Sequence, residues 1–277
     1  MSNIFISYGD KNFTKSLKRI GREAKSLNRF DEIRLYTPKD LPESLKASPL
    51  FCFEKGGGYW LWKAYLIQKT LESCKEGDIL YYVDAGCTLQ PESLEWERYN
   101  EIIKEYNGIF FQYRDANYEG WEQFCSCIEN NSSQIYHWMK PSVVEYFKQY
   151  TQGDDFKYFS KIWGGALIIK KCATMKILDE WFKIMLFNPQ LVIDPFGCEL
   201  MNLSASFNAH RHDQAILTPL VFYYQQEEKL YVMPETSESQ PDVAAIVASR
   251  KRDKRFRSRG ERIKYNIKQI IYGLCQK

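Results

Sequence analysis

Residues 77–87 read GDILYYVDAGC, and this stretch decides the fold class. Its centre, Ile79 to Val83, is an unbroken run of apolar and aromatic side chains. A strand with one wet face alternates polar and apolar residues, whereas a strand covered on both faces, as in a parallel sheet, does not. The run therefore predicts a buried parallel strand. The polar loop Asp84-Ala85-Gly86 follows it directly, at the position where α/β proteins carry ligand-binding groups.

Strands and helices alternate on both sides of this run. Upstream, residues 3–8 are β-prone, and the apolar residues between 13 and 27 recur at the three- and four-residue steps of a helix. Residues 60–74 repeat that helical spacing and stop before Gly77. Downstream, residues 108–113 and 163–169 predict two more strands. The alternation predicts an α/β fold, with a mostly parallel sheet flanked by helices in a single domain.

The remaining segments are shorter or less regular. Residues 33–36 and two β-prone patches, 230–233 and 243–247, predict further short strands. We expect Thr174 to cap a helix that runs to Met185, and Pro219 to end or kink a helix that starts near Ala215. Residues 114–153 are aromatic, polar and weakly periodic, and are interpreted as inserted loops.

Composition narrows the class of protein. The 277 residues carry a net charge of +3 and are 44% hydrophobic and 16% aromatic, which excludes a disordered or collagen-like chain. No apolar stretch is long enough to span a membrane, and the first residues lack the basic start of a signal peptide, so we expect a cytoplasmic protein. With three histidines and no CxxC pair, zinc binding is not expected. The cysteines are expected to be reduced thiols: 52, 74, 87, 125, 127, 172, 198 and 275.

Positive charge is concentrated near the C-terminus. Residues 250–268 hold ten Lys or Arg against two acidic residues, whereas the rest of the chain is acidic. Apolar residues from Ile263 to Leu274 recur at helical spacing among these cations. We therefore divide the chain into a body, residues 1–249, and a basic amphipathic C-terminal helix within 250–277. That helix either lies on an anionic membrane surface or packs on the body with its cations solvated.

Residues 56–63 read GGGYWLWK, directly before the helix that leads to the Asp84 strand. Three glycines allow positive φ angles and the close approach of a ligand to bare backbone. The following helix N-terminus offers unpaired amides to a phosphate, and Lys63 adds a positive charge. The alternative is that the glycines make a turn and the aromatic residues fill the core. The flat side chains that a base or sugar ring could stack on are Tyr59, Trp60 and Trp62.

Two further groups of residues are candidates for metal binding or catalysis. Asp84-Ala85-Gly86 is similar to the DxD signature of nucleotide-sugar glycosyltransferases but lacks its second aspartate, the partner that helps hold a divalent cation. Either Asp84 holds Mg²⁺ or Mn²⁺ with water, or Lys63 and Arg250 neutralise the diphosphate directly, or Asp84 only forms a turn. Residues 210–214, HRHDQ, crowd a carboxylate among cations; Asp213 there is either a catalytic group or a helix cap.

The order of these motifs resembles that of bacterial GT-A-fold glycosyltransferases from capsule and lipopolysaccharide loci. The similar blocks are residues 7–10, 58–63, 77–87, 164–166 and 210–214, and together they span about residues 3 to 225. The resemblance implies a Rossmann-like nucleotide-binding sheet, a nucleoside-diphosphate sugar donor and a saccharide or lipid-linked saccharide acceptor. One position departs: Ala64 stands where the family carries proline, a change that a first helical turn tolerates.

Together, the residues and the resemblance imply a set of site residues. Asp213 is expected beside the anomeric carbon, as a general base or as a stabiliser of positive charge, and Asp84 is the candidate metal ligand. We expect no nucleic-acid partner. The alternatives are a nucleic-acid- or glycan-binding protein that uses the basic tail, and a sugar nucleotidyltransferase. The expected nucleotide-binding residues are Tyr8, Gly9, Gly58, Trp60, Lys63, Asp84, Gly86 and Arg250; the expected sugar-binding residues are Tyr59, Trp62, Gly164, Gly165, Arg211, His212 and Gln214.

Overall fold

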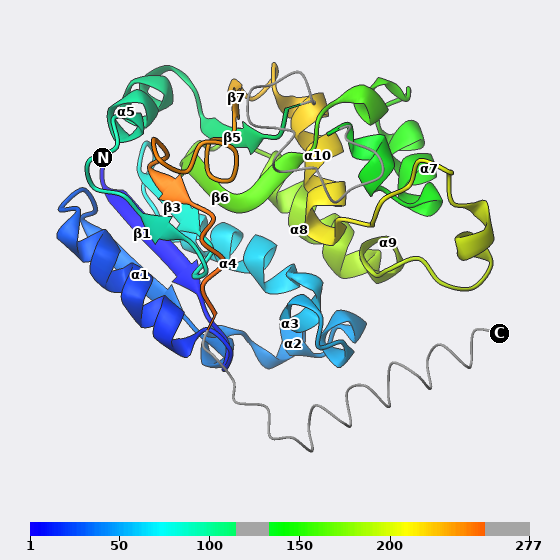
Figure 1. Cartoon of the computed structure of the whole chain (residues 1–277), viewed down its shortest axis with the longest axis horizontal. Coiled ribbons are helices and arrows are strands. Elements are labelled where there is room, and N and C mark those ends of the chain that lie inside the picture. Colours follow the sequence, from blue (N-terminus) through cyan, green and yellow to red (C-terminus); the bar gives the residue numbers. More distant parts are fainter. Residues whose placement is uncertain (115–132, 253–277) are drawn as a thin grey trace.

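The computed structural model describes residues 1–114 and 133–252. A six-stranded sheet with the order β2-β1-β3-β6-β5-β7 forms its centre (Figure 1). All of these strands run in one direction except β6, which is antiparallel to both of its neighbours. The strands are β1 (Asn3–Tyr8), β2 (Glu32–Tyr36), β3 (Ile79–Val83), β5 (Gly108–Gln112), β6 (Ile162–Lys170) and β7 (Leu230–Pro234).

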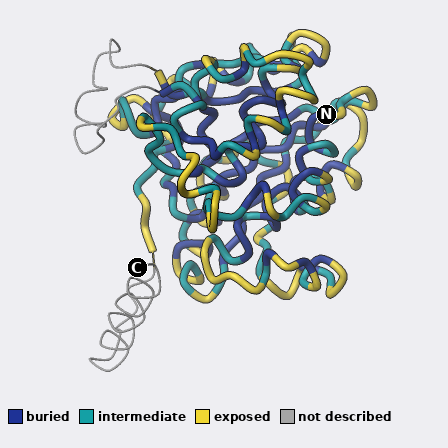
Figure 2. Tube along the Cα trace, turned by 90° about the vertical axis from the view of Figure 1, so that its right-hand side faces the viewer, coloured by how far each residue is buried: buried dark blue, intermediate teal, exposed yellow. Residues whose placement is uncertain are grey.

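Helices cover both faces of this sheet. Alternate side chains of a strand point to opposite faces, so Ile4 and Ile6 of β1 join one core cluster and Phe5 joins the other. The helices α1 (Thr14–Ser26) and α5 (Glu95–Glu105) pack on the Phe5 face. Figure 2 shows the buried trace running through the middle of the molecule. The opposite face carries α4 (Leu61–Glu72), α7 (Pro141–Tyr150), α8 (Ile177–Phe187) and α10 (His212–Tyr224).

Short elements connect these layers. A two-stranded sheet pairs β4 (Thr88–Leu89) with β8 (Ile246–Val247), so the end of the described chain returns to the loop after β3. The short helices are α2 (Glu43–Lys46), α3 (Gly56–Tyr59) and α9 (Pro189–Val192). Single 3₁₀ turns are Pro38–Asp40, Pro49–Cys52, Ile135–Trp138, Asp155–Tyr158 and Gly197–Asn202.

The predicted fold class, a mostly parallel sheet flanked by helices in a single domain, is confirmed. One local prediction is wrong: Thr174 caps no helix, because α8 begins at Ile177 after Lys176. Of the two effects expected of Pro219, it does not end α10, which continues to Tyr224. The predicted basic C-terminal helix falls in residues 253–277, outside the described residues.

Candidate functional site

Three elements converge at the carboxyl end of β3. Because β6 runs antiparallel, its first residues lie beside the last residues of β3, and the Asp84 amide donates to the carbonyl oxygen of Gly165 at 2.8 Å. Lys63 lies in the first turn of α4 and Asp213 in the first turn of α10. Both helices therefore begin at this edge of the sheet and direct a charged side chain toward Asp84.

The ammonium of Lys63 joins these elements. Its Nζ lies 2.8 Å from the Gly164 carbonyl oxygen, 3.2 Å from Asp213 Oδ2 and 3.5 Å from Asp84 Oδ1. The side chain is only 3% exposed. Burial lowers the pKa of Lys63, but the two carboxylates outweigh burial and the net pKa lies above its ordinary value. Lys63 is therefore a buried cation shared by two carboxylates.

Asp213 is the deeper of the two carboxylates. Burial raises its pKa above the ordinary value, although the charge of Lys63 opposes that shift. Its Oδ2 is buried, and its charged partner among the described residues is the Lys63 ammonium at 3.2 Å. A side chain at Gly164 would place its Cβ 3.5 Å from this oxygen and 3.1 Å from Gln214 Cγ, so glycine there leaves room for both neighbours. Asp213 does not cap α10, where no side chain caps the N-terminus.

Asp84 is the more open carboxylate, with 36% of its side chain exposed. The hydroxyl of Tyr82 donates to its Oδ1, the oxygen that also faces Lys63. Within residues 1–114 and 133–252, no three His, Cys, Asp or Glu side chains are grouped to hold a metal ion. The ammonium and the phenol both hold Oδ1, so Oδ2 is the oxygen left for a divalent cation, and a single carboxylate oxygen makes a weak site for Mg²⁺ or Mn²⁺ unless substrate phosphates complete it.

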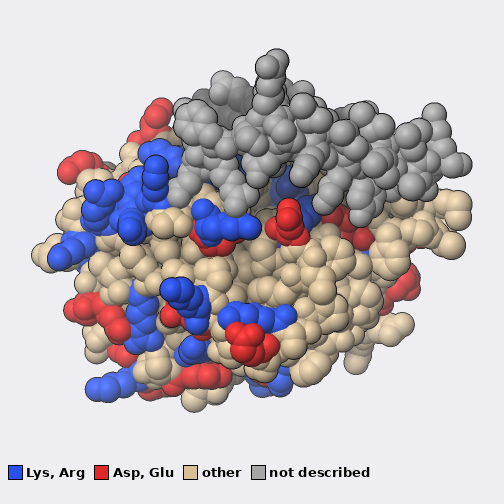
Figure 3. All heavy atoms as spheres, turned by 90° about the horizontal axis from the view of Figure 1, so that it is seen from below, with Lys and Arg blue, Asp and Glu red and all other residues tan. Residues whose placement is uncertain are grey.

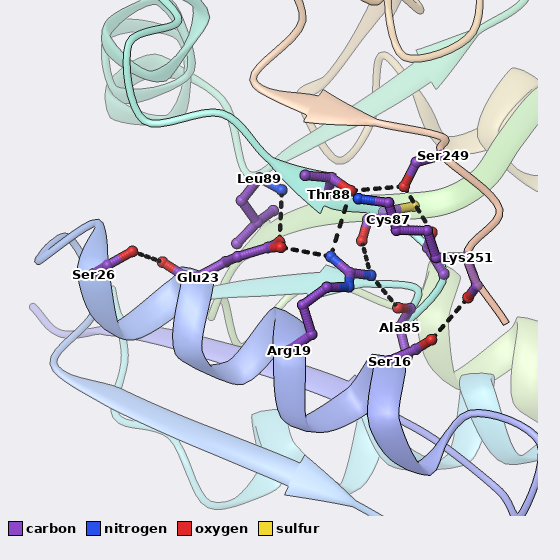
Figure 4. A network of polar contacts seen from close by, with 11 residues as sticks. Ser16, Arg19, Glu23, Ser26, Ala85, Cys87, Thr88, Leu89, Ser249 and Lys251 are labelled. Carbon is purple, nitrogen blue, oxygen red and sulfur yellow. Dashed lines mark hydrogen bonds and ion pairs between the residues drawn. The ribbon is translucent and has the colours of Figure 1, made fainter. Parts of the chain in front are cut away.

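The loop after Asp84 is held from the side of α1 (Figure 4). Arg19 donates from Nη2 to the carbonyl oxygens of Ala85, at 3.0 Å, and Cys87, at 2.6 Å. Glu23 fixes Arg19 in turn, with an Nη1 to Oε1 distance of 2.7 Å. A guanidinium that binds the carbonyls of two residues in one loop fixes the backbone of that loop.

The end of the described chain holds the same loop from the other side. The Lys251 amide and the Ser249 hydroxyl both donate to the Gly86 carbonyl oxygen, at 2.9 and 3.0 Å (Figure 4). Between them, Arg250 lies beside Gly86, and its guanidinium pairs with Glu238 at 2.9 Å. The Arg250 side chain is 72% exposed, so its positive charge faces solvent next to the loop.

The glycine-rich segment forms a left-handed turn. Gly56, Gly57 and Gly58 have φ angles of 60°, 59° and 96°, as the sequence predicted, and Tyr59 and Trp60 continue at 51° and 61°. The left-handed region is unfavourable for residues that carry a Cβ atom. The two aromatic residues are therefore held there by contacts from elsewhere in the fold.

Those contacts come from the start of α10. The His212 ring lies 4.9 Å from that of Tyr59 and stacks on that of Trp60 at 5.5 Å. His212 Nδ1 binds the Val192 carbonyl oxygen and His210 Nε2 binds that of Leu191, each at 2.9 Å. Burial lowers the pKa of His210 to about 3 and that of His212 to about 4, so both rings are neutral at pH 7.

The structure does not gather all of the predicted residues at one point. Lys63, Asp84, Gly164, Gly165 and Asp213 meet, with Gln214 against Gly164 and Gly86 with Arg250 on the adjoining loop. Gly58, Tyr59, Trp60 and His212 form a neighbouring group. Tyr8 and Trp62 are buried and stack on each other at 3.9 Å, Gly9 packs against Leu17, and Arg211 lies 4.5 Å over the Trp138 ring.

Several polar residues of this region were not predicted. Tyr82 binds Asp84, Glu238 binds Arg250, and Asp194 binds Tyr59. Lys161 is buried between the rings of Tyr113 and Trp138, at 3.8 and 4.2 Å. Glu238, Asp194 and Lys161 stand in segments without a motif, whereas Tyr82 lies in the apolar run 79–83, which predicted only a buried strand.

Comparisons with known proteins give weak similarities. No protein-family model and no curated protein matches the chain. One similar solved structure is a glycosyltransferase involved in glycosylation of the major capsid of PBCV-1, at 11% identity over 96% of this chain and 98% of that one, with a TM-score of 0.43. Another is the galactosyltransferase LgtC with donor and acceptor sugar analogs, at 15% identity over 83% and 72%, with a TM-score of 0.36.

A third is core-mannan synthase A from Aspergillus fumigatus in its Mn/GDP form, at 10% identity over 84% of this chain and 73% of that one, with a TM-score of 0.39. These similar structures are all glycosyltransferases. At such identities and TM-scores, however, the similarity assigns no activity to this chain.

Proposed function

We propose that this chain is a glycosyltransferase that moves a sugar from a nucleoside-diphosphate sugar to a saccharide or lipid-linked saccharide. The observation that carries the proposal is the buried Lys63, which holds Asp84 and Asp213 together at the carboxyl end of β3. Ligands of open α/β sheets bind at that edge. The motifs that resemble those of capsule and lipopolysaccharide enzymes support the same activity, with a hexose as the sugar and bacterial surface polysaccharide as the product.

The donor diphosphate is proposed to bind along the loop from Asp84 to Gly86. Arg250 supplies an exposed positive charge beside this loop, and Glu238 orients its guanidinium. A fixed cation next to a leaving diphosphate stabilises the negative charge that develops there. Lys63 is buried behind Asp84, and its ammonium offsets the negative charge that Asp84 presents to the donor.

Asp213 is the proposed catalytic residue. Its Oδ2 pairs with the Lys63 ammonium at 3.2 Å, and a carboxylate oxygen has room for a further hydrogen bond, such as one from an acceptor hydroxyl. The raised pKa suits a carboxylate that takes the proton of that hydroxyl, which would invert the anomeric centre. The same charge next to an oxocarbenium-like centre would instead support retention.

The first test of this proposal is thermal unfolding with UDP-, GDP-, CMP- and dTDP-sugars, each with and without Mn²⁺. Ligand at about 100 times its Kd adds roughly 2.7 kcal/mol, which raises the Tm by several degrees. A shift with one nucleotide class supports the proposal, and a cooperative transition that no nucleotide sugar moves would refute it. With the donor found, Asp213→Asn is expected to lower turnover at least about 100-fold with unchanged nucleotide affinity.

We also propose that the enzyme works in the cytoplasm, peripherally bound to the inner face of the membrane. None of the described helices is long and apolar enough to span a bilayer. The outward face of α1 carries exposed Lys18, Arg22 and Lys25, and Ser16 of the same helix donates to the Lys251 carbonyl oxygen at 2.9 Å. The basic C-terminal segment thus begins beside a basic helix.

Figure 3 shows Lys and Arg side chains mainly on one side of the face it presents, with Asp and Glu side chains among them. Exposed cations are attracted to anionic lipid, and salt screens that attraction. Sedimentation with anionic vesicles should therefore be strong at low salt and weak at high salt. A chain that ends at residue 252 should bind less than the full chain. No sedimentation of the full chain at low salt would refute the membrane proposal.

A further inference from the structure

A second polar cluster lies next to Asp213, centred on Asp194 in the loop after α9. Lys55 Nζ lies 2.8 Å from each carboxylate oxygen of Asp194, and the Tyr59 hydroxyl donates to Oδ2 at 3.0 Å. His212 Nε2 lies 3.6 Å from Oδ1. Asp194 is 44% exposed, so a ligand reaches it from solvent.

His212 and Asp194 face each other as two acceptors. The Val192 carbonyl oxygen accepts the hydrogen on His212 Nδ1, so a neutral ring presents a bare lone pair at Nε2. Burial lowers the pKa of His212 to about 4 and thus keeps the ring neutral. On the carboxylate, Lys55 uses both oxygens and Tyr59 uses Oδ2, which leaves an acceptor position on Oδ1 among the contacts of the described residues. Two acceptors at this separation have no hydrogen to share between them.

We infer that Asp194 Oδ1 and His212 Nε2 form a seat for the hydroxyl groups of a saccharide next to Asp213. A hydroxyl supplies the missing hydrogen to one acceptor, and a neighbouring hydroxyl on the same ring supplies it to the other. This inference rests on the proposed glycosyltransferase activity only for whether the sugar belongs to the donor or to the acceptor.

The charge and surroundings of the seat favour a neutral sugar over a cation. Lys55 already neutralises Asp194, and His212 is uncharged, so the seat carries no net charge to attract an ammonium. An exposed aromatic ring lies near the seat, because Phe53, at 43% exposure, packs against the buried ring of Tyr59. Saccharides present apolar C–H faces together with hydroxyls, and aromatic rings beside a carboxylate match both.

The variant that tests the seat is Asp194→Asn. Its amide keeps the shape and one acceptor oxygen but gains an NH₂ group that donates directly to His212 Nε2 and closes the seat. Loss of the Lys55 ion pair disturbs the fold little, because both partners are about half exposed. The matched control is Glu54→Gln, which removes one negative charge from the exposed residue next to Lys55 and leaves the seat intact.

The assay is saturation-transfer NMR of the full chain with a panel of methyl hexosides. We expect binding of at least one glycoside to wild type and to Glu54→Gln, and roughly tenfold weaker binding to Asp194→Asn. Displacement of that glycoside by the nucleotide sugar found in the thermal screen assigns the hydroxyls to the donor sugar. Retention of the glycoside assigns them to the acceptor.

Two results would overturn the inference: no glycoside binds wild type, or Asp194→Asn binds as well as Glu54→Gln. Both differ from a failure of the proposed function. If no nucleotide sugar stabilises the chain, the transferase proposal fails, whereas the glycoside titrations still decide whether the seat binds a saccharide.

Discussion

Replacing Lys63 by methionine removes the ammonium that Asp84 and Asp213 share while keeping a side chain of similar length. Asp213 is 5% exposed and would lose its opposite charge. Stranding one member of a buried ion pair costs about 3–5 kcal/mol. The unpaired Asp84 adds little to this cost, because its side chain is 36% exposed and water screens its charge. In a chain of this size the loss corresponds to a fall in Tm of about 6–20 °C.

The assay is urea unfolding at pH 7, followed by tryptophan fluorescence. Adding Asp213→Asn to Lys63→Met removes the stranded charge and is expected to restore about 1–3 kcal/mol. The pH dependence gives a second readout. Because the folded-state pKa of Asp213 is raised, the folded protein holds its proton more tightly, and the stability of Lys63→Met should fall as pH rises above the ordinary pKa of an aspartate.

Two outcomes would contradict this reasoning. The first is a Lys63→Met variant within about 1 kcal/mol of wild type, which would mean that solvent reaches Asp213 and stabilises its charge. The second is a double variant that is less stable than Lys63→Met alone. In that case the amide of Asp213→Asn would destabilise the fold more than the unpaired Asp213 carboxylate does. The ion pair with Lys63 would then not be what holds β3, α4 and α10 together.

Three further predictions concern stability. Burial raises the pKa of Glu235 from 4.5 to about 7, so the free energy of unfolding should fall by roughly 3 kcal/mol as pH rises between these values, and Glu235→Gln should flatten that dependence in urea titrations. Gly58→Ala should cost about 1–3 kcal/mol, because φ is 96° and the new methyl meets a ring at 3.0 Å; Gly153→Ala, in open space, is the control. Arg19→Ala should speed amide exchange in residues 85–87, and unchanged exchange would show that other contacts hold the loop.

The sequence predicted which strands are buried, but not the direction in which each strand runs. β1 was predicted with its observed bounds because its residues are β-prone, and β3 because a strand covered on both faces is apolar throughout. The same property conceals direction, so residues 163–169 did not show that β6 runs against its neighbours. Pro219 illustrates a different limit: tertiary packing of α10, where Pro219 and both flanking residues are buried, overrides the local preference.

Only part of the site could be predicted, because a local pattern does not show which distant segments meet. Lys63 and Asp84 stand in runs whose composition signals a turn before a helix and a loop after a buried strand. Their contact with Asp213 depends on how α4 and α10 start at one sheet edge, which no local pattern contains. Asp194 shows the limit most clearly, because Tyr59 and Lys55 lie 135 and 139 residues away from it along the chain.

The reversed direction of β6 has a consequence for how the protein folds. Its first residues complete the cluster around Lys63, whose partner Gly164 is 101 residues away in sequence. Contacts between distant segments form slowly, because the intervening loop must be closed before they contribute any stability. The ion-paired cluster can therefore assemble only once β6 has docked between β3 and β5. A partly synthesised chain that stops short of α10 lacks Asp213 and exposes Lys63 without its deepest partner.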